Sequence, residues 1–350
     1  MGIYKEWQNK YNSFNSLKAL KHIDYWKSIS QEKIPPPIFV SIDPMNLCNF
    51  NCPHCNAKRI IKNSKMGKDT MDNILIALKA WKTKSCCIGG GGESLLNDNS
   101  HYLIDILSKN DIEIGVVTNG SRLDQYVEDA KNCRWVGISI DSSNSKTFSK
   151  MKGVNENIFD SVINNVQLLA SKNYTEVTYK FLVHPNNYDE IYEASKLAKE
   201  IGCNLIHIRP GSNPWFEDIN YKFNSDMITE ALHQINRARI NLEDDNFKVY
   251  GVIHKFDDDW SCKKSFNKCW AMYVTCFISP DGTIGLCCDR RGDKNIEMCN
   301  IRDYSEWGSE HHINLANSVN IKTCPRCTYT YLNEIFENVI IDDKMLCNFI

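Results

Sequence analysis

The sequence has little net charge, no long apolar run and no segment of low complexity. Its 41 Lys and Arg residues nearly balance 43 Asp and Glu residues, so no excess of positive charge favours nucleic acid or an anionic membrane. No run of about 18 apolar residues predicts a membrane-spanning helix. The first residues lack the apolar core of a secretion signal. We therefore expect a cytoplasmic protein that binds neither nucleic acid nor a membrane.

Cysteine, in contrast, is abundant, with 16 residues in a chain of 350. Two interpretations compete. The cysteines form a disulfide framework with some buried thiols, or they ligate a metal or cluster, which reducing compartments favour. Because no secretion signal is present, we favour ligation.

Alternating strand and helix patterns predict an α/β fold. Short apolar runs typical of strands are separated by segments with helical periodicity. The predicted strands are 38–43, 85–90, 113–119, 135–141, 177–183 and 204–210. Strands joined by helices pair in parallel, and sites in such folds lie at the carboxyl ends of the strands. The alternation stops after Pro214.

Four regions follow from these patterns. Residues 1–36 are expected to be a helical extension that ends at three consecutive prolines, and residues 37–215 to be the strand–helix domain. Residues 216–261 are expected to be a helical linker, with a helix over 225–240. Residues 262–350 are short of periodicity and hold nine of the 16 cysteines, so we expect a small cluster-bearing domain there.

The first cysteine motif directly follows the first predicted strand. Cys48, Cys52 and Cys55 have the spacing CxxxCxxC. Thiolates suit iron–sulfur clusters and zinc, but a structural zinc site wants four protein ligands, and no fourth is near. Three ligands on a cubane cluster leave one iron open to an amino-acid-like cofactor.

This motif resembles that of the radical SAM superfamily, whose members use S-adenosylmethionine (SAM). Further motifs recur in order at predicted strand ends. They are Gly89-Gly90-Gly91-Gly92-Glu93, similar to the family's GGE motif, Thr118-Asn119-Gly120, and Ser139-Ile140-Asp141. No Lys-Ser or Lys-Thr follows the glycines, which disfavours a phosphate-binding P-loop. Where relatives often carry Arg-Gly, this chain has Lys152-Gly153, and lysine supplies charge without a bidentate fork.

The resemblance implies a partial (β/α)6 TIM-like barrel and a set of SAM contacts. They are His54, Gly91, Gly92, Glu93, Asn119, Ser139, Lys152 and Arg209. Two of these have alternatives, since His54 either packs on adenine or faces solvent, and Arg209 either faces the site or forms a surface ion pair. The resemblance also implies that a 4Fe–4S cluster, reduced by a donor such as flavodoxin or ferredoxin, cleaves SAM to a 5′-deoxyadenosyl radical that abstracts hydrogen.

A second cysteine group resembles the twitch and SPASM domains, which hold auxiliary iron–sulfur clusters. Cys269, Cys287, Cys324 and Cys327 match one auxiliary 4Fe–4S cluster, with zinc as the alternative. Residues 280–283 predict a hairpin turn between two strands that the first two cysteines flank. A full SPASM domain has two more cysteines, where this chain has Asn333 and Glu337.

Three hypotheses cover the reaction. The first is a radical SAM dehydrogenase that oxidises a sugar or aminocyclitol alcohol, with the auxiliary cluster accepting an electron. The second is a peptide or protein maturase that crosslinks, epimerises or oxidises a side chain, although the N-terminal extension is short for a leader-binding domain. The third is a non-enzymatic metal-binding scaffold or electron carrier, which the SAM-like motifs disfavour. We favour the first.

The sequence identifies no catalytic base or hydrogen donor. Cys288, beside a proposed ligand, is either a hydrogen-atom donor or an idle thiol. Residues 289–291, Asp-Arg-Arg, either face the substrate or form a solvated run of charge. The remaining cysteines at strands or helix ends are expected to be core residues, and they are Cys86, Cys87, Cys133 and Cys203.

Overall fold

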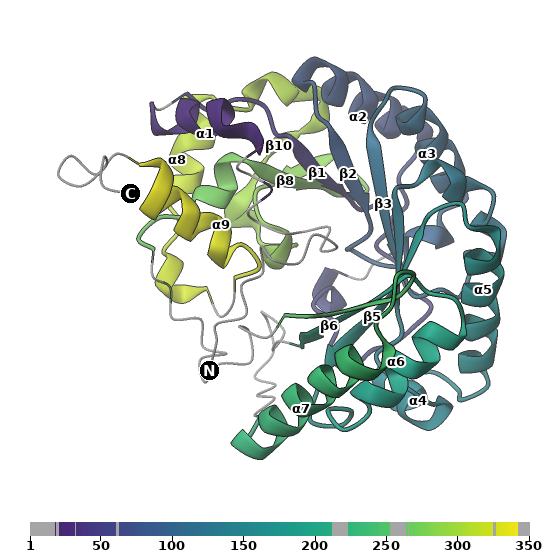
Figure 1. Cartoon of the computed structure of the whole chain (residues 1–350). Coiled ribbons are helices and arrows are strands. Elements are labelled where there is room, and N and C mark those ends of the chain that lie inside the picture. The colour runs from purple at the N-terminus through teal and green to yellow at the C-terminus, as the bar shows by residue number, and fades with distance from the viewer. Residues whose placement is uncertain are drawn as a thin grey trace.

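A twisted sheet of ten strands forms the centre of the molecule (Figure 1). The computed structural model describes residues 18, 21–31, 33–60, 63–211, 223–252, 264, 266–324 and 327–341. The strands are β1 (Phe39–Ile42), β2 (Ser85–Ile88), β3 (Glu113–Thr118), β4 (Trp135–Ser139), β5 (Glu176–Val183), β6 (Leu205–Pro210), β7 (Lys248–Gly251), β8 (Thr275–Ile278), β9 (Thr283–Gly285) and β10 (Glu297–Asn300). The helices are α1 (Ile23–Ser30), α2 (Lys68–Trp81), α3 (Ser100–Ser108), α4 (Ser145–Lys152), α5 (Ile158–Lys172), α6 (Ile191–Glu200), α7 (Ser225–Leu242), α8 (Glu310–Asn317) and α9 (Thr330–Ile335).

Strands β1 to β7 pair in parallel and in chain order, with helices between them. Parallel neighbours need crossover connections, which the helices provide. The six predicted strands are confirmed as β1 to β6, and the α/β fold with a large parallel sheet, as in a partial TIM-like barrel, is confirmed with them. All their carboxyl ends lie at one edge of the sheet, which is where such folds place their sites.

The sheet continues beyond the range that the sequence predicted. The expectation that the alternation stops after Pro214 is wrong, because α7 is followed by β7, which pairs with β6. At the other side of the sheet, β8 pairs in parallel with β1 over Phe39–Ile42 and Thr275–Ile278. The C-terminal region therefore extends the same sheet and is continuous with it.

The C-terminal part of the sheet is antiparallel, as the hairpin turn predicted. Strands β8 and β9 pair antiparallel, and β10 adds to β9. Gly282 in the turn has a φ of 87°, a left-handed conformation that glycine adopts without a steric cost. The hairpin sets Cys269 before β8 and Cys287 after β9, on the two sides of the expected turn.

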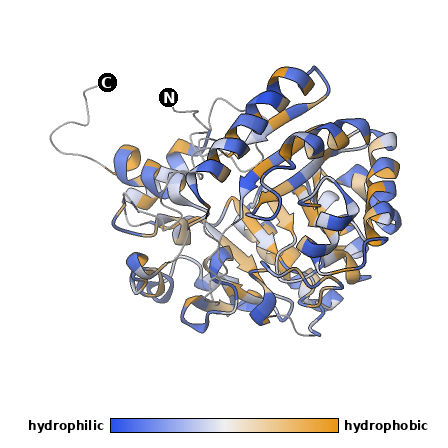
Figure 2. Ribbon diagram, turned by 90° about the horizontal axis from the view of Figure 1, so that it is seen from below, coloured by the Kyte–Doolittle hydropathy of each residue, from blue (hydrophilic) through white to orange (hydrophobic). Residues whose placement is uncertain are grey.

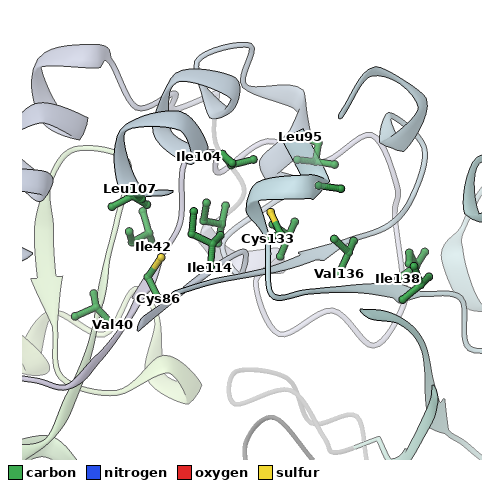
Figure 3. Packing of buried hydrophobic residues seen from close by; sticks show 14 of the residues in the cluster. Val40, Ile42, Cys86, Leu95, Ile104, Leu107, Ile114, Cys133, Val136 and Ile138 are labelled. Atoms are coloured by element: carbon green, nitrogen blue, oxygen red, sulfur yellow. The ribbon is translucent and has the colours of Figure 1, made fainter. Parts of the chain in front are cut away.

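The main core lies between the sheet and its surrounding helices. Figure 3 shows Val40, Ile42, Cys86 and Ile114 on adjacent strands, facing Ile104 and Leu107 of α3. All six are at most 2% exposed. Burying each such aliphatic side chain contributes roughly 1.5–3 kcal/mol to stability. In Figure 2 the central strands are mostly apolar, whereas the outer helices mix apolar and polar residues. The opposite face of β5 and β6 carries several polar side chains, among them Thr178, Lys180 and Arg209.

Some expectations concern the ends of the chain and the core thiols. Of residues 1–36, the described part includes α1, which contacts the segment Phe336–Ile340. The four cysteines that were expected in the core are buried. Cys262 and Cys347 lie outside the described residues. Within the described ranges no helix is long and apolar enough to cross a membrane.

Candidate functional site

The first cysteine loop begins where β1 ends, at the carboxyl edge of the sheet. The thiols of Cys48, Cys52 and Cys55 are partly buried and close together, so that in addition to burial the charges of Cys48 and Cys55 both raise the pKa of Cys52, and the charge of Cys55 raises that of Cys48. Burial raises the pKa of Cys52 to about 11. A metal centre must therefore displace protons as it binds these thiols. Across the described ranges, no three His, Cys, Asp or Glu side chains are set closely enough to hold a single metal ion.

Donors from the chain point at the first sulfur of this loop. The amide N–H of Phe50 lies 3.4 Å from Cys48 Sγ, and Asn119 Nδ2 lies 3.9 Å from the same atom. Asn119 also donates to Asn49 Oδ1 at 2.9 Å. Hydrogen bonds to ligating sulfur tune the potential of iron–sulfur clusters. Asn119, predicted as a SAM contact, thus lies directly beside the cysteine loop.

The glycine-rich segment packs against the backbone of the cysteine loop. A Cβ atom on Gly92 would lie 2.4 Å from the carbonyl oxygen of Leu47, and one on Gly91 would lie 2.2 Å from Asn46 Oδ1. The N–H of Glu93 donates to the Leu47 carbonyl at 2.9 Å. Only residues without a side chain permit this close approach. The segment therefore fixes the position of the loop that carries the three cysteines.

The carboxylate of Glu93 ties the glycine segment to the end of β3. It is 3% exposed and accepts hydrogen bonds from Leu95 N (3.1 Å), Thr118 Oγ1 (2.7 Å) and Asn119 N (2.6 Å). Burial raises its pKa, and the three donors oppose that rise. Glu93 thus has a structural role at the place where the family motif expects a SAM contact, and that contact stays a prediction.

One buried hydrogen-bond acceptor beside the cysteine loop has no donor among the described residues. Asn46 Oδ1 is buried and has no hydrogen-bond partner, and it lies against Gly91. Leaving such an atom unpaired costs roughly 1–3 kcal/mol. A ligand with an ammonium group would satisfy it, so three thiols beside an unpaired acceptor fit a cluster that binds an amino acid. Only its place before Cys48 distinguishes Asn46 in the sequence.

Lys152 lies in a buried ion pair. Its ammonium contacts Asp141 Oδ2, and both side chains are at most 3% exposed. Burial opposes the charge on Asp141, but Lys152 outweighs it and holds the pKa of that carboxyl well below its usual range. The Lys152 carbonyl accepts from Asn51 N at 3.0 Å. Lys152 therefore supports the cysteine loop from α4, and its expected contact with SAM remains a prediction.

Asp141 is the central residue of this support and adopts a left-handed φ of 61°. Its Oδ1 accepts from Leu182 N at 2.7 Å, its Oδ2 lies 3.7 Å from His54 Nε2, and its carbonyl accepts from Asn187 Nδ2 at 2.8 Å. A non-glycine residue in this conformation persists where its surroundings hold it. These contacts join β4, β5 and the cysteine loop.

His54 faces a second histidine that the sequence analysis missed. The rings of His54 and His184 are 4.3 Å apart, and both residues are buried. Burial, followed by the charge of His54, lowers the pKa of His184 to about 3. Of the two alternatives for His54, the solvent-facing one is wrong, because the residue is buried. Only its place after β5 distinguished His184 in the sequence, since a contact between tilted rings from two distant segments leaves no local pattern.

Ser139 and Arg209 lie at the carboxyl ends of β4 and β6, as predicted. Ser139 is in register with Lys180 of β5, and Arg209 with Leu182. Arg209 is partly exposed and lies near Lys180, whose pKa its charge lowers. Lys180 was not singled out from the sequence, because a lone lysine in a strand carries no motif.

The second cysteine group lines one cavity. Cys269, Cys287, Cys324 and Cys327 all contribute to its wall, together with Tyr329. Burial raises the pKa of Cys269 to about 11. Sequence spacing predicted that these four thiols, spread over residues 269–327, form one group. The fold brings all four to the wall of the same cavity. Four soft donors around one cavity suit an iron–sulfur cluster, whereas the zinc alternative is disfavoured because no three such side chains among the described residues are close enough to hold a single ion.

Asn333 and Glu337 hold the loop that carries Cys269. Asn333 Oδ1 accepts from Ala271 N at 2.9 Å, and its Nδ2 lies 3.7 Å from Cys327 Sγ. Glu337 accepts from Asn267 N at 3.0 Å and from Trp270 Nε1 at 3.2 Å. The positions where a full SPASM domain has cysteines are thus used for hydrogen bonds to the protein's own chain.

Arg291 connects the second cavity to the barrel. It bonds the carboxylate of Asp43, at the end of β1, through Nε at 2.5 Å and Nη2 at 3.1 Å. Its Nη1 donates to the carbonyl of Cys288 at 2.6 Å. The interpretation of residues 289–291 as a solvated run is wrong, since Asp289 is also buried and accepts from Thr328 N. Arg291 is ion-paired with Asp43, so the structure does not support a substrate-facing Arg291 either.

Cys288 faces Tyr329, with Sγ and Oη 3.2 Å apart. Tyr329 is part of the cavity wall, and burial raises its pKa well above the ordinary value. Cys288 also affects the pKa of Cys87, which lies on β2. The thiol therefore lies between the second cavity and the barrel strands.

Comparisons with known proteins agree with this architecture. Residues 42–208 match the Radical SAM superfamily. A probable GTP 3′,8-cyclase of Saccharolobus islandicus strain L.S.2.15 is 23% identical over 166 residues, 47% of this chain and 53% of that protein. An S-adenosylmethionine-dependent nucleotide dehydratase of a Fibrobacter species is 32% identical over 108 residues, 29% of this chain and 32% of that protein. The chain spans about half the length of the first of these relatives.

Solved structures extend the likeness to the C-terminal region. Streptococcus suis SuiB bound to precursor peptide SuiA has a TM-score of 0.67 at 19% identity, covering 91% of this chain and 76% of that one. Native anSMEcpe with bound AdoMet has a TM-score of 0.62 at 18% identity, covering 85% and 88%. These likenesses show a shared fold. Residues 42–208, with their cysteine loop at the end of β1, thus form a region that matches the radical SAM superfamily, and this match supports SAM and a 4Fe–4S cluster as cofactors.

Proposed function

We propose that the protein is a radical SAM dehydrogenase that oxidises an alcohol of a small polar substrate, a sugar or aminocyclitol, with an auxiliary 4Fe–4S cluster accepting an electron. One observation carries the proposal. Four thiols line a single cavity, and Arg291 joins the loop of that cavity to Asp43 at the mouth of the barrel. An electron acceptor next to the site of hydrogen abstraction is what dehydrogenation needs.

In this proposal Cys48, Cys52 and Cys55 hold the first cluster, and SAM occupies the edge of the sheet above it. When bound, these cofactors supply a radical that removes a hydrogen atom from carbon. The chain supplies positions and charge. Asn46 Oδ1 accepts from the amino group of SAM, and the glycine segment keeps that acceptor in place.

The other proposed contacts surround the cofactor from successive strands. His54 and His184 form an aromatic pair on which the adenine packs, and Asp141 with Lys152 keeps His54 in position. The remaining proposed contacts follow the family motifs, and they are Gly91, Gly92, Glu93, Asn119, Ser139, Lys152 and Arg209.

The second cluster is assigned to Cys269, Cys287, Cys324 and Cys327. With all four thiols in one cavity wall, this centre has a full set of protein ligands and needs no substrate to complete it. Such a centre suits electron transfer better than substrate binding. A flavodoxin or ferredoxin is the proposed donor of the electron that starts each turnover.

A peptide or protein maturase is the second candidate. The chain shares its fold with SuiB, whose structure contains a precursor peptide, over 91% of its length. At 19% identity this likeness supports the fold and gives no information on the substrate. The alternative predicts that candidate peptides, and not sugars, stimulate the formation of 5′-deoxyadenosine.

Isotope labelling separates oxidation from epimerisation. Oxidation gives a product two hydrogens lighter than the substrate, with no solvent deuterium at the reacting carbon in heavy water. Cys288→Ser should retain this activity, because oxidation needs no thiol donor. An isomeric product with one deuterium, lost in Cys288→Ser, would show that the protein is an epimerase and that our proposal is wrong.

A further inference from the structure

Arg291 joins the loop of the second cysteine group to the edge of the barrel through its planar side chain. Its Nε and Nη2 donate to the two carboxylate oxygens of Asp43, at 2.5 and 3.1 Å, and Nη2 also donates to Ser41 Oγ at 3.1 Å. In the other direction, Nη1 donates to the carbonyl of Cys288 at 2.6 Å. A guanidinium presents its donors in a rigid fork, so it bonds both segments at once, which the ammonium of a lysine does not do.

The same guanidinium supports the glycine segment. A Cβ atom on Gly90 would lie 2.3 Å from Arg291 Nη2 and 2.6 Å from Asp43 Oδ1. The backbone of Gly90 therefore rests directly on the ion pair, with a φ of 149° that glycine adopts without strain. The next residue, Gly91, lies against Asn46, which carries the acceptor proposed for the amino group of SAM. Direct contacts thus lead from Arg291 to the proposed SAM site.

The position of Arg291 depends on the loop that carries Cys287. Arg291 lies four residues after Cys287, beyond a short turn of 3-10 helix. The carboxylate of Asp289, in this turn, accepts from Thr328 N at 2.7 Å, next to Cys327. Cys287 and Cys327 both line the second cavity. A centre bound in that cavity therefore holds the turn that presents Arg291 through both of these ligands.

Burial makes this arrangement sensitive to a movement of the turn. The side chain of Asp43 is 1% exposed and that of Arg291 is 14% exposed. A buried carboxylate is unfavourable without its cation, so Asp43 must follow a displaced Arg291. Gly90 touches both side chains and must shift with them. An exposed ion pair would not transmit such a displacement, because water would replace the lost partner.

We propose that Arg291 is a positioning residue for SAM. It holds Gly90, and through Gly90 the glycine segment, in the shape that receives SAM, and this shape depends on an occupied second centre. The inference rests on the cluster assignments of the proposed function and adds a regulation of the cofactor site. The protein thus binds SAM tightly only when its electron acceptor is in place. Because coupling between two binding sites is reciprocal, SAM also stabilises the second centre.

SAM affinity with and without the second centre tests the coupling. Wild type and a second-centre variant, Cys324→Ala with Cys327→Ala, are reconstituted anaerobically, and calorimetry measures SAM binding without reductant, so that no turnover occurs. Iron analysis checks that the first cluster is intact in both. We expect the variant to bind SAM about fivefold more weakly or worse, which still permits cleavage at saturating SAM. An equal Kd in the two proteins would overturn the proposal.

Arg291→Lys separates coupling from stability. Lysine keeps a positive charge beside Asp43 but lacks the fork that also reaches the Cys288 carbonyl. We expect weaker SAM binding in this variant, with nearly the same Kd whether or not the second-centre cysteines are also replaced, because the link is already broken. Its melting temperature should stay closer to that of the wild type than that of Arg291→Met, which leaves Asp43 unpaired.

A control and a contrary outcome complete this cycle. Lys294→Met removes a cation from the same loop, where Lys294 pairs with Glu297 at the surface, and it should change neither SAM affinity nor its dependence on the second centre. If the second-centre substitutions weaken SAM binding as much in Arg291→Lys as in the wild type, the link does not run through Arg291 and the proposal is wrong.

The reciprocal effect is measured on the second centre itself. SAM should slow the release of its iron to a chelator in the wild type, and should have no such effect in Arg291→Lys. Equal protection by SAM in both proteins would contradict the proposal. None of these measurements needs a substrate. A wild type that shows the coupling but forms no dehydrogenated product would refute the proposed function alone, whereas product formation without the coupling would refute only the role of Arg291.

Discussion

The two cysteine regions are held in shape by different means. The first loop is enclosed by backbone, since Gly91 and Gly92 lie directly on Asn46 and Leu47. The second pocket is assembled by side chains, chiefly Asn333 and Glu337, which bond the backbone at Ala271 and Asn267. In the first region the backbone atoms are so close that an added side-chain atom would clash. In the second region, replacing one side chain removes only the hydrogen bonds that this side chain makes. We therefore expect abrupt losses in the first region and graded losses in the second.

The largest effect should follow from removing the first cluster. The wild type should contain about eight iron and eight sulfide per chain after anaerobic reconstitution. Replacing Cys48, Cys52 and Cys55 with Ala should remove about four of each and abolish SAM cleavage, because no thiolate remains to hold that cluster. Iron and sulfide analysis, with chromatography of 5′-deoxyadenosine, measures both. Stoichiometric zinc without iron in the wild type would refute the assignment of both regions.

Removing ligands of the second cluster should separate cleavage from product formation. Cys324→Ala with Cys327→Ala should preserve SAM cleavage by a strong reductant, since the first loop is intact. Product should fail to form, because the electron of the substrate radical has no acceptor. Assays of 5′-deoxyadenosine and product on the same samples measure the two steps. A full yield of product in this variant would mean that the second centre is only structural.

A single methyl group should disturb the first region. In Gly92→Ala the new Cβ would lie 2.4 Å from the Leu47 carbonyl oxygen, so the cysteine loop must shift, at a cost of about 1–3 kcal/mol. We expect lower iron content at the first centre and a lower melting temperature. Gly67→Ala is the control, because nothing lies within 4 Å of its Cβ position. Equal behaviour of the two variants would contradict the enclosure by backbone.

The smallest effects should come from the clamp of the second region. Asn333→Ala leaves Ala271 N without its side-chain acceptor in a buried site, which should reduce stability by about 1–3 kcal/mol. Thermal unfolding measures the loss, and Asn338→Ala, at an exposed position, is the control.

Glu337 adds a dependence on pH to the same clamp. Burial acts to raise its pKa, but the hydrogen bonds from Asn267 and Trp270 outweigh burial and lower it from 4.5. A carboxyl with a lowered folded pKa contributes stability above its unfolded pKa and loses it as the pH falls through the folded value. Glu337→Gln should therefore be less stable than the wild type at neutral pH, and the difference should shrink in acid. A constant difference across this range would contradict the assignment.

Much of the fold was predictable because local patterns of apolar and polar residues indicate the strands and helices. The boundaries of β1 to β6 differ by only a few residues from the apolar runs, since each strand buries one face against helices. The cysteine loop was predictable from its spacing. Strand β7 was missed because Lys248–Gly251 is short and follows a charged segment. The pairing of β8 with β1 was missed because contacts between distant segments leave no periodicity.

The candidate site was also predictable only in part, because local motifs identify residues but not their partners from distant segments. Motifs pointed to His54, Glu93 and Lys152, but their roles depend on partners from other strands. Nothing near Lys152 in the sequence reveals its pairing with Asp141, and nothing near Arg291 reveals Asp43. Buried ion pairs and ring contacts form between elements that only the folded sheet brings together.

The pairing of β1 with β8 has a consequence for synthesis on the ribosome. One side of β1 finds its partner only after the chain has grown from Phe39 to Ile278, so the barrel emerges with an exposed strand edge. Exposed edges invite pairing with other chains, and such distant contacts form slowly. Until the C-terminal quarter has been synthesised, the nascent barrel is thus prone to aggregation. During the same interval Asp43 lacks its ion-pair partner Arg291. A ribosome stalled before β8 should yield a chain that depends on chaperones, whatever its supply of iron.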